Sequence, residues 1–333
     1  MKKPFLTIVV PCYNEEEVLD ETTKQLTQMM ESMLERDLIS DDSKILYVDD
    51  GSKDATWSLI SEKTADNRWV TGVKLSRNFG HQGALLAGLN AAYEKSDCIV
   101  SIDADLQDDV RVIADFLEKF REGYDVVYGV RGKRDTDTFF KRNTALAFYR
   151  FMERIGVKLV PNHADYRLLS KRALKEFLNY KEENMFIRGI IPLLGFKSTK
   201  VYYDRNERFA GESKYPLKKM ISFAVDGITS FSIAPIRMLL ALGFVMFAVG
   251  IGIGIYALVQ KIMGQVTAGW TSLMISVWIV GGIQLLAIGV LGEYIGKIFK
   301  EVKGRPRYTI EENLYAEKVA KEEVRETKIS SIQ

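Results

Sequence analysis

The segment KILYVDDGSKDAT, residues 44–56, joins a short apolar run to a turn at Gly51 and the polar start of a helix. The same order recurs from Leu6 to Arg131, where β-branched runs alternate with longer amphipathic stretches such as residues 16–36 and 109–122. The runs are LTIVV, KILYVDD, VTGVKLS, CIVSID and DVVYGV. Strands that alternate with helices indicate a parallel sheet covered by helices. We therefore predict an α/β fold with a mainly parallel sheet.

Polar residues follow the first two of these strands, and ligands of parallel α/β sheets bind outside the carboxyl ends of the strands. The residues that end these strands or open the next helix are Pro11, Asn14, Glu15, Asp49 and Asp50. A carboxylate at a strand end can accept a hydrogen bond from a nucleobase N–H or a ribose hydroxyl. Helix capping explains Ser52 or Asp54, but it does not explain the two aspartates before Gly51. This edge of the sheet is therefore a candidate ligand site.

The segment SIDADLQDD, residues 101–109, ends the fourth strand with two carboxylates two residues apart. In an extended chain Asp103 and Asp105 point the same way, and Gln107 adds another oxygen to the row. Such carboxylates repel each other unless a cation lies between them, so a divalent ion that carries a diphosphate fits the pattern. The alternative is that these acids only end a strand, and that the last two aspartates cap the next helix.

The C-terminal third lacks charged residues over two long stretches. No Asp, Glu, Lys or Arg occurs between Arg237 and Lys261 or between Lys261 and Glu293. About 20 apolar residues cross a bilayer core, so each stretch is long enough to span a membrane. Basic residues dominate the outer flanks of both stretches, and the link carries only Lys261. This asymmetry predicts that both termini are cytoplasmic and that a short external hairpin joins the spans.

Two other segments allow less definite predictions. Residues 137–155 have an apolar face, and the two interpretations, a helix packed on the sheet and an interfacial helix in the headgroup layer, both stay open. Residues 311–333 are charged and lack periodicity, which predicts a frayed helix or disorder.

The remaining composition excludes several classes of protein. The balance of 46 Lys and Arg against 44 Asp and Glu argues against a nucleic-acid binder. Cys12 and Cys98 each lie beside β-branched residues, which predicts buried reduced thiols rather than a metal site. His81 and His163 have no sequence neighbour that would complete a metal site or a catalytic triad. We therefore expect catalysis from neither histidine.

The chain resembles the inverting glycosyltransferases of family 2, which have the GT-A nucleotide-sugar fold. The resemblance covers nearly the whole chain and rests on PCYNEEE, VDDGSKDAT, KLSRNFGHQGALLAGL, DADLQDD, YGVRGKR, ADYRLLS and RNERFAGESKY, in that order. With two apolar stretches behind them, these motifs are most similar to polyprenyl-phosphate glycosyltransferases, the subgroup of dolichol-phosphate mannose synthases and bacterial undecaprenyl-phosphate sugar transferases. The implied parts are a cytoplasmic GT-A domain (1–214), a juxtamembrane amphipathic helix (215–235), two transmembrane helices (236–298) and a charged cytoplasmic tail (299–333).

The resemblance also implies a site, position by position. The residues expected to bind the nucleotide sugar are Pro11, Tyr13, Asn14, Glu15, Asp49, Asp50, Ser52 and Asp103. The Mg²⁺ or Mn²⁺ ligands are Asp105 and Gln107. The residues expected to hold phosphate groups of donor and acceptor are Arg131, Arg205, Arg208, Ser213 and Lys214. The catalytic set is Asp103, Asp105, Arg131 and Asp165, the last beside the acceptor.

The implied reaction is transfer of one sugar, with inversion, from a UDP-sugar to a polyprenyl phosphate at the inner face of the cytoplasmic membrane. UDP-glucose and UDP-N-acetylglucosamine are the two main donor candidates. A phosphate monoester has a second pKa of about 6, so the acceptor is already ionised at neutral pH and needs no strong base. Asp165 then orients the acceptor, orients nearby Lys and Arg groups, or takes the residual proton, and all three roles stay open.

Other functions and partners remain to be weighed. A processive polysaccharide synthase would carry a QxxRW motif, which is absent, and a glycolipid synthase would need a firm general base. A non-catalytic membrane protein with a nucleotide-binding domain would not need Asp103 and Asp105. The pairs Gly250 with Gly254 and Gly292 with Gly296 suit helix packing, so we expect a homo-oligomer. A small membrane flippase is the partner expected downstream.

Overall fold

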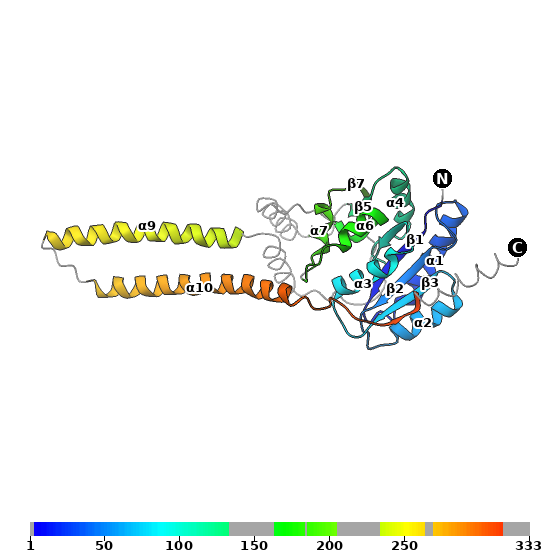
Figure 1. Ribbon diagram of the computed structural model, residues 1–333, viewed down its shortest axis with the longest axis horizontal. Coiled ribbons are helices and arrows are strands. Elements are labelled where there is room, and N and C mark those ends of the chain that lie inside the picture. The colour runs from blue at the N-terminus through cyan, green and yellow to red at the C-terminus, as the bar shows by residue number, and fades with distance from the viewer. Residues whose placement is uncertain (1–2, 133–162, 184, 205–233, 264–268, 316–333) are drawn as a thin grey trace. The chain divides into compact units, whose positions relative to one another are not determined.

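The first of two units in the chain is built on one eight-stranded sheet (Figure 1). The computed structural model describes residues 3–132, 163–183, 185–204, 234–263 and 269–315. The first unit takes Met1–Arg150, Lys158–Lys214 and Pro306–Gln333, and the second takes Phe151–Val157 and Tyr215–Arg305.

The strand order across the sheet is β7-β5-β6-β4-β1-β2-β3-β8. In chain order the strands are β1 (Leu6–Cys12), β2 (Lys44–Asp49), β3 (Val70–Leu75), β4 (Cys98–Ser101), β5 (Val126–Arg131), β6 (His163–Ser170), β7 (Ser198–Tyr203) and β8 (Ile310–Asn313). The pairs β1·β2, β1·β4, β2·β3 and β5·β7 are parallel, whereas β6 and β8 run antiparallel to their neighbours. The mainly parallel sheet predicted from the sequence is confirmed.

Helices of this unit connect and cover the strands. Within the described residues they are α1 (Leu19–Glu35), α2 (Thr56–Asp66), α3 (His81–Tyr93), α4 (Val112–Arg121), α6 (Lys171–Leu178) and α7 (Ile187–Leu193). Helix α3 lies unusually close to β1 and β2. A Cβ at Gly88 would lie 2.4 Å from Cγ1 of Val9 and 2.7 Å from Cγ2 of Val48, so glycine is required there.

The strand ends agree closely with the sequence patterns. Pro11 is an exception, because it lies inside β1 and pairs with Val48 rather than ending the strand. Cys12 and Cys98 are both buried free thiols, as predicted. Burial raises the pKa of each, so both thiols stay protonated and unreactive.

The prediction for the C-terminal tail is wrong for its first residues. Strand β8 pairs antiparallel with β3 and forms an edge of the sheet. Lys74 of β3 forms ion pairs with Glu311 and Glu312, at 3.3 and 3.4 Å, and Tyr315 is buried. Acidic residues in a charged tail thus complete a sheet because a lysine on the neighbouring strand matches them.

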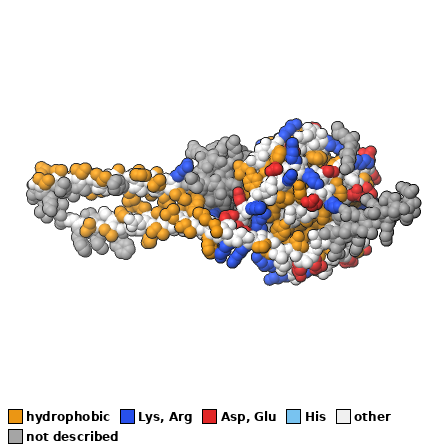
Figure 2. All heavy atoms as spheres, viewed as in Figure 1, with side chains coloured by type: hydrophobic (Ala, Val, Ile, Leu, Met, Phe, Trp, Pro, Cys, Tyr) orange, Lys and Arg blue, Asp and Glu red, His pale blue; other side chains and the backbone are white. Residues whose placement is uncertain are grey.

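The second unit contains two long apolar helices, α9 (Ala234–Ile262) and α10 (Trp270–Lys303), which contact each other. Their apolar side chains are exposed, with Phe244 67% and Leu285 72% exposed, and Figure 2 shows hydrophobic side chains along both helices. By length and composition, Pro235–Ile253 and Ile279–Lys303 are each able to cross a membrane. The stretches 137–155 and 215–233 lie outside the described residues, so the two predicted amphipathic helices remain predictions.

Candidate active site

Strand β6 brings the two most important predicted acids together. It runs antiparallel to β4, with Ser101 opposite Arg167, so the same register puts Asp103 opposite Asp165 just beyond the end of β4. The Ser101 hydroxyl donates to the carbonyl oxygen of Asp165 at 2.5 Å. Arg131 ends β5, the other neighbour of β6. Three of the predicted catalytic residues thus gather at one edge of the sheet.

The segment after β4 has the alternation that the sequence predicted. Asp103, Asp105 and Gln107 are half-buried, whereas the residues between them are buried. The chain is not a regular strand here, because β4 ends at Ser101 and Leu106 has a positive φ of 56°. A turn therefore presents these three side chains at the carboxyl end of β4.

Asp165 is surrounded by positive charge. The guanidinium of Arg188 donates to both of its oxygens, through Nη2 at 2.9 Å and Nε at 3.3 Å, and the buried Arg167 donates to Oδ1. Burial alone would raise the pKa of Asp165, but the charges of Arg188 and Arg167 and a bond from His81 hold it well below its usual range. A carboxylate held in this way is a poor proton acceptor, which favours the orienting role over the base.

His81 joins Asp165 to Asp103. Its Nε2 atom lies 3.4 Å from Oδ2 of Asp165 and 3.7 Å from Oδ1 of Asp103. Burial opposes a charge on the imidazole, but the hydrogen bond of Asp165 and the charges of both acids raise the pKa of His81 to about 9. The histidine is therefore charged at neutral pH. Sequence reasoning missed this role, and the available signal was the position of His81 at the start of α3, shortly after a strand end.

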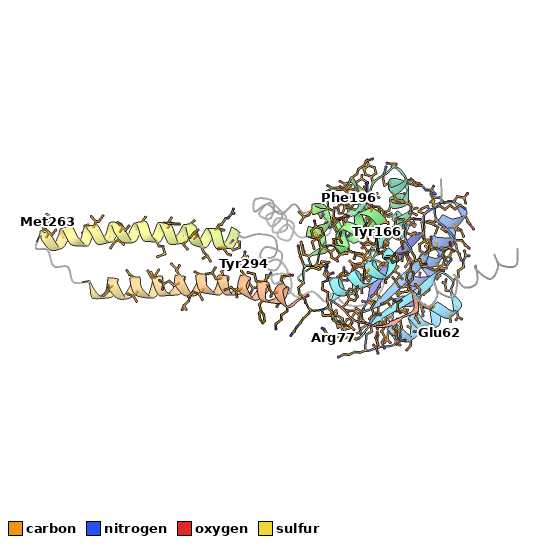
Figure 3. All side chains as sticks on the ribbon, in the orientation of Figure 1. Glu62, Arg77, Tyr166, Phe196, Met263 and Tyr294 are labelled. Atoms are coloured by element: carbon orange, nitrogen blue, oxygen red, sulfur yellow. The ribbon has the colours of Figure 1, made fainter. Side chains whose placement is uncertain are left out.

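Arg131 is held by an acid that sequence reasoning treated as a possible helix cap. Asp108 is buried, and its Oδ1 accepts from Arg131 Nη2 at 3.1 Å and from the Tyr203 hydroxyl at 2.5 Å. Burial opposes the charge of Arg131, but the charge of Asp108 raises its pKa. Tyr166, labelled in Figure 3, packs edge-on against Tyr203 with ring centroids 5.3 Å apart. The capping interpretation of Asp108 is therefore wrong.

The residues predicted to surround the nucleotide lie in two interlocked loops. The Asn14 N–H donates to the Ser52 hydroxyl at 3.0 Å, the Lys53 N–H donates to the Asn14 side chain at 2.9 Å, and the Glu15 N–H donates to Thr56 at 2.9 Å. Asn14 has a positive φ of 54°. The loops after β1 and β2 therefore form one rigid rim, next to the half-buried Tyr13.

The carboxylates of Asp49 and Asp50 accept hydrogen bonds from backbone N–H groups. Asp49 has no exposed surface and accepts from the Ser52 N–H at 3.3 Å. Asp50 accepts from the Phe79 N–H at 2.7 Å and the Gly80 N–H at 2.9 Å, which fixes the loop before His81. Burial raises the pKa of both carboxyl groups. Contacts to a nucleotide stay a prediction for these two residues.

The described residues supply only part of a coordination shell for a divalent ion. Within the described residues, no three His, Cys, Asp or Glu side chains form a complete metal site. However, Asp103 lies near three other acids, and burial together with their charges raises its pKa, against the opposing charge of His81. A hard cation prefers oxygen ligands, so Asp105 and Gln107 would hold it and phosphate oxygens would complete its coordination. The predicted phosphate-binding residues Arg205, Arg208, Ser213 and Lys214 lie outside the described residues.

Comparison with known proteins identifies the family. The model of Glycosyl transferase family 2 matches residues 7–178, and that of the GtrB C-terminal hairpin matches residues 234–298. The chain therefore belongs to glycosyltransferase family 2, with a GT-A-like fold, as the motifs predicted.

Relatives match along almost the whole chain. An uncharacterized glycosyltransferase, YkoT of Bacillus subtilis (strain 168), is 59% identical over 318 residues, which is 96% of this chain and 94% of that protein. The SfII prophage-derived bactoprenol glucosyl transferase of Shigella flexneri is 37% identical over 310 residues, which is 92% of this chain and 98% of that protein. A solved structure of S. aureus TarS 1-349 in complex with UDP-GlcNAc is 17% identical, with a TM-score of 0.40, and the match covers 67% of this chain and 66% of that chain.

Proposed function

We propose that this protein transfers glucose from UDP-glucose to a polyprenyl phosphate, such as undecaprenyl phosphate, at the inner face of the cytoplasmic membrane. The observation that carries the proposal is the similarity to a bactoprenol glucosyl transferase over 92% of this chain, a span that includes the apolar hairpin. Glucose is preferred to N-acetylglucosamine for the same reason. The product would be a polyprenyl-monophosphate glucose.

The donor half of the reaction is supported by the acids after β4. Asp103 lies at the carboxyl end of the strand, where nucleotides bind in such sheets. A bound Mg²⁺ or Mn²⁺ ion would supply charge to stabilise the departing UDP. Asp105 and Gln107 are the residues that would hold it, and Arg131 would face the same phosphate groups.

The acceptor half needs orientation more than proton removal. The phosphate monoester is its own ionised nucleophile, with a second pKa of about 6. The cations around Asp165 keep its pKa low, which suits a group that orients its neighbours. A glycolipid synthase would need a stronger base at this place, so the phosphate acceptor fits better.

The membrane part of the proposal is supported by α9 and α10. We infer that both helices cross the membrane, with both termini cytoplasmic, because basic residues flank the hairpin. The lipid acceptor and the enzyme would then share one membrane. Association through Gly250 with Gly254 and Gly292 with Gly296, and use of the product by a flippase, stay predictions.

The test is a transfer assay with the purified full-length protein in detergent. UDP-glucose, UDP-N-acetylglucosamine and GDP-mannose would each be offered with undecaprenyl phosphate, with undecaprenol or with diacylglycerol, in the presence of Mg²⁺ or Mn²⁺. We expect UDP release and a glucosylated lipid only with UDP-glucose and the lipid phosphate. Equal transfer to undecaprenol or diacylglycerol would contradict the phosphate acceptor, and a preference for UDP-N-acetylglucosamine would contradict glucose.

A further inference from the structure

Arg188 is an arginine at the active-site edge to which no role was assigned from the sequence. It is the second residue of α7, and it makes two bonds to Asp165, at 2.9 and 3.3 Å. The side chain of Asp165 is 6% exposed, whereas that of Arg188 is 37% exposed. The acid is therefore buried behind a guanidinium that reaches the surface.

Arg131, at the end of β5, is held in the same way, with a buried acid paired to a partly exposed guanidinium. The side chain of Asp108 is 1% exposed, and it holds Arg131, which is 28% exposed. The two arginines are electrostatically coupled. Burial opposes the charge of Arg188, the charges of Asp165 and Asp103 raise its pKa, and the charge of Arg131 acts against them. Two partly exposed guanidinium groups thus lie close enough to act on each other, each paired with a buried acid.

The ion pair with Asp165 neutralises the charge of Arg188 only in part. Asp165 has one negative charge, and it is shared with the buried Arg167 and with the charged His81. Arg167 alone would already satisfy a buried carboxylate. Two of the three groups around Asp165, Arg188 and His81, are each more than a third exposed, so the cluster presents positive charge at the surface.

The guanidinium is also fixed in place before any ligand binds. The Ile187 N–H donates to the side chain of Gln82 at 3.3 Å, and Ile187, Ile190 and Ile191 are buried. Helix α7 is thereby attached at its start to α3, beside His81. The bonds to Asp165 use Nε and Nη2 of Arg188, and within the described residues Nη1 donates to no acceptor. A planar fork with free N–H groups suits phosphate oxygens.

We propose that Arg188 binds a phosphate group of the substrates beside Arg131, and that Asp165 is the positioning residue that holds it there. The assignment rests on the proposed transfer between two phosphate-bearing substrates. The phosphate belongs either to the diphosphate of the nucleotide sugar or to the lipid acceptor. Asp165 then acts through Arg188, without taking a proton.

Binding and kinetic measurements on the full-length protein test this assignment. The variants are R188A, R188K, D165N and the double variant D165N/R188A. R172A is the matched control, because Arg172 pairs with a buried acid, Asp125, at 2.5 Å but lies outside the active-site cluster. The measurements are the KM for UDP-glucose, the KM for undecaprenyl phosphate, and the affinities for UDP and uridine by calorimetry.

If Arg188 contacts the nucleotide sugar, R188A should bind UDP about 10-fold more weakly, since a charge-assisted hydrogen bond is lost. It should bind uridine, which has no phosphate, with normal affinity. If Arg188 instead contacts the lipid phosphate, R188A should have normal UDP affinity and a KM for undecaprenyl phosphate raised about 10-fold. R188K should recover part of the loss in either case, and R172A should match the wild type. If Asp165 acts through Arg188, D165N/R188A should be no worse than R188A in kcat/KM.

Several outcomes would overturn the assignment. One is an R188A variant whose UDP affinity and both KM values stay within 2-fold of the wild type. Another is a folded D165N/R188A variant that loses the product of the two single losses, since Asp165 would then act independently. If the wild type transfers no sugar to any lipid, the proposed function fails instead. Arg188 is then judged by direct binding of UDP and of undecaprenyl phosphate, where a loss in R188A supports the assignment and no loss refutes it.

Discussion

The two halves of the active-site edge use the same residue type in opposite ways. On the β1 and β2 side, Asp50 accepts two backbone N–H groups and so fixes the loop before α3. On the β4 and β6 side, Asp165 and Asp108 hold side-chain cations. Aspartates at strand ends therefore serve either to set a loop conformation or to hold charge in place. The difference predicts distinct responses to mutation, pH and salt.

The largest expected effect is on the charge-holding side. D165N leaves Arg167 buried without its anionic partner, which should cost about 3–5 kcal/mol of unfolding free energy. Denaturant unfolding of the purified protein measures this. D125N is the matched control, because the partner of Asp125, Arg172, is 69% exposed, so its loss should be clearly smaller. If D165N and D125N lost equal unfolding free energy, burial of the cationic partner would not decide the cost of removing the acid.

Asp105 tests the same side through activity rather than stability. D105N should reduce kcat by about 10²–10³-fold, the usual cost of removing an electrostatic contact to the leaving group, while the protein stays folded. Treatment with EDTA should reproduce the loss, and added Mg²⁺ or Mn²⁺ should restore activity to the wild type alone. Full activity of the wild type in EDTA would remove the metal from the reaction.

The backbone-holding side should respond more weakly and without dependence on salt. D50N keeps one acceptor oxygen and replaces the other with an NH₂ donor, so one of the two part-buried N–H groups loses its carboxylate acceptor, at a cost of about 1–3 kcal/mol. G51A should cost about 1–2 kcal/mol for its left-handed backbone alone. A Cβ there would also lie 2.6 Å from the carbonyl carbon of Arg77. Thermal unfolding at two salt concentrations measures both, and a strong salt dependence would contradict a backbone role.

The smallest expected effect is the pH dependence from His81, because its side chain is 35% exposed and solvent screens its ion pairs. Folding raises its pKa from about 6.5 to about 9. Its protonation therefore stabilises the folded protein fully below pH 6.5, and this contribution is lost as pH rises through about 9. The Tm of the wild type should thus fall more steeply between pH 7 and 10 than that of H81Q. Parallel Tm curves would show that His81 is not charged in the folded protein.

The sequence was sufficient for the first five strands of the sheet and for half of the candidate site. Strands β1 to β5 were predictable because each is a compact β-branched run, and Asp103, Asp105 and Gln107 because they follow one such run directly. Asp165 and Arg131 came from the family resemblance. Their gathering at one edge is what the structure adds.

The rest was not predictable because it depends on pairing between distant segments. The direction of β6 decides which acid faces Asp103, and the Ser101 contact that fixes it joins residues 64 positions apart. His81, Arg188 and Asp108 acquire their roles only through that pairing. β8 was missed for a simpler reason, because its sequence IEEN has two charged residues in four and lacks the pattern of a strand.

β8 also limits how the first unit can be separated from the hairpin. It pairs with β3 through Val73, Lys74 and Leu75, and the Tyr308 hydroxyl lies 2.7 Å from the Asn90 side chain. A fragment that ends before α9 would leave β3 as an open edge, and open edges promote aggregation. A soluble version of this domain should therefore carry residues 306–315, joined by a linker in place of the hairpin or supplied as a separate peptide.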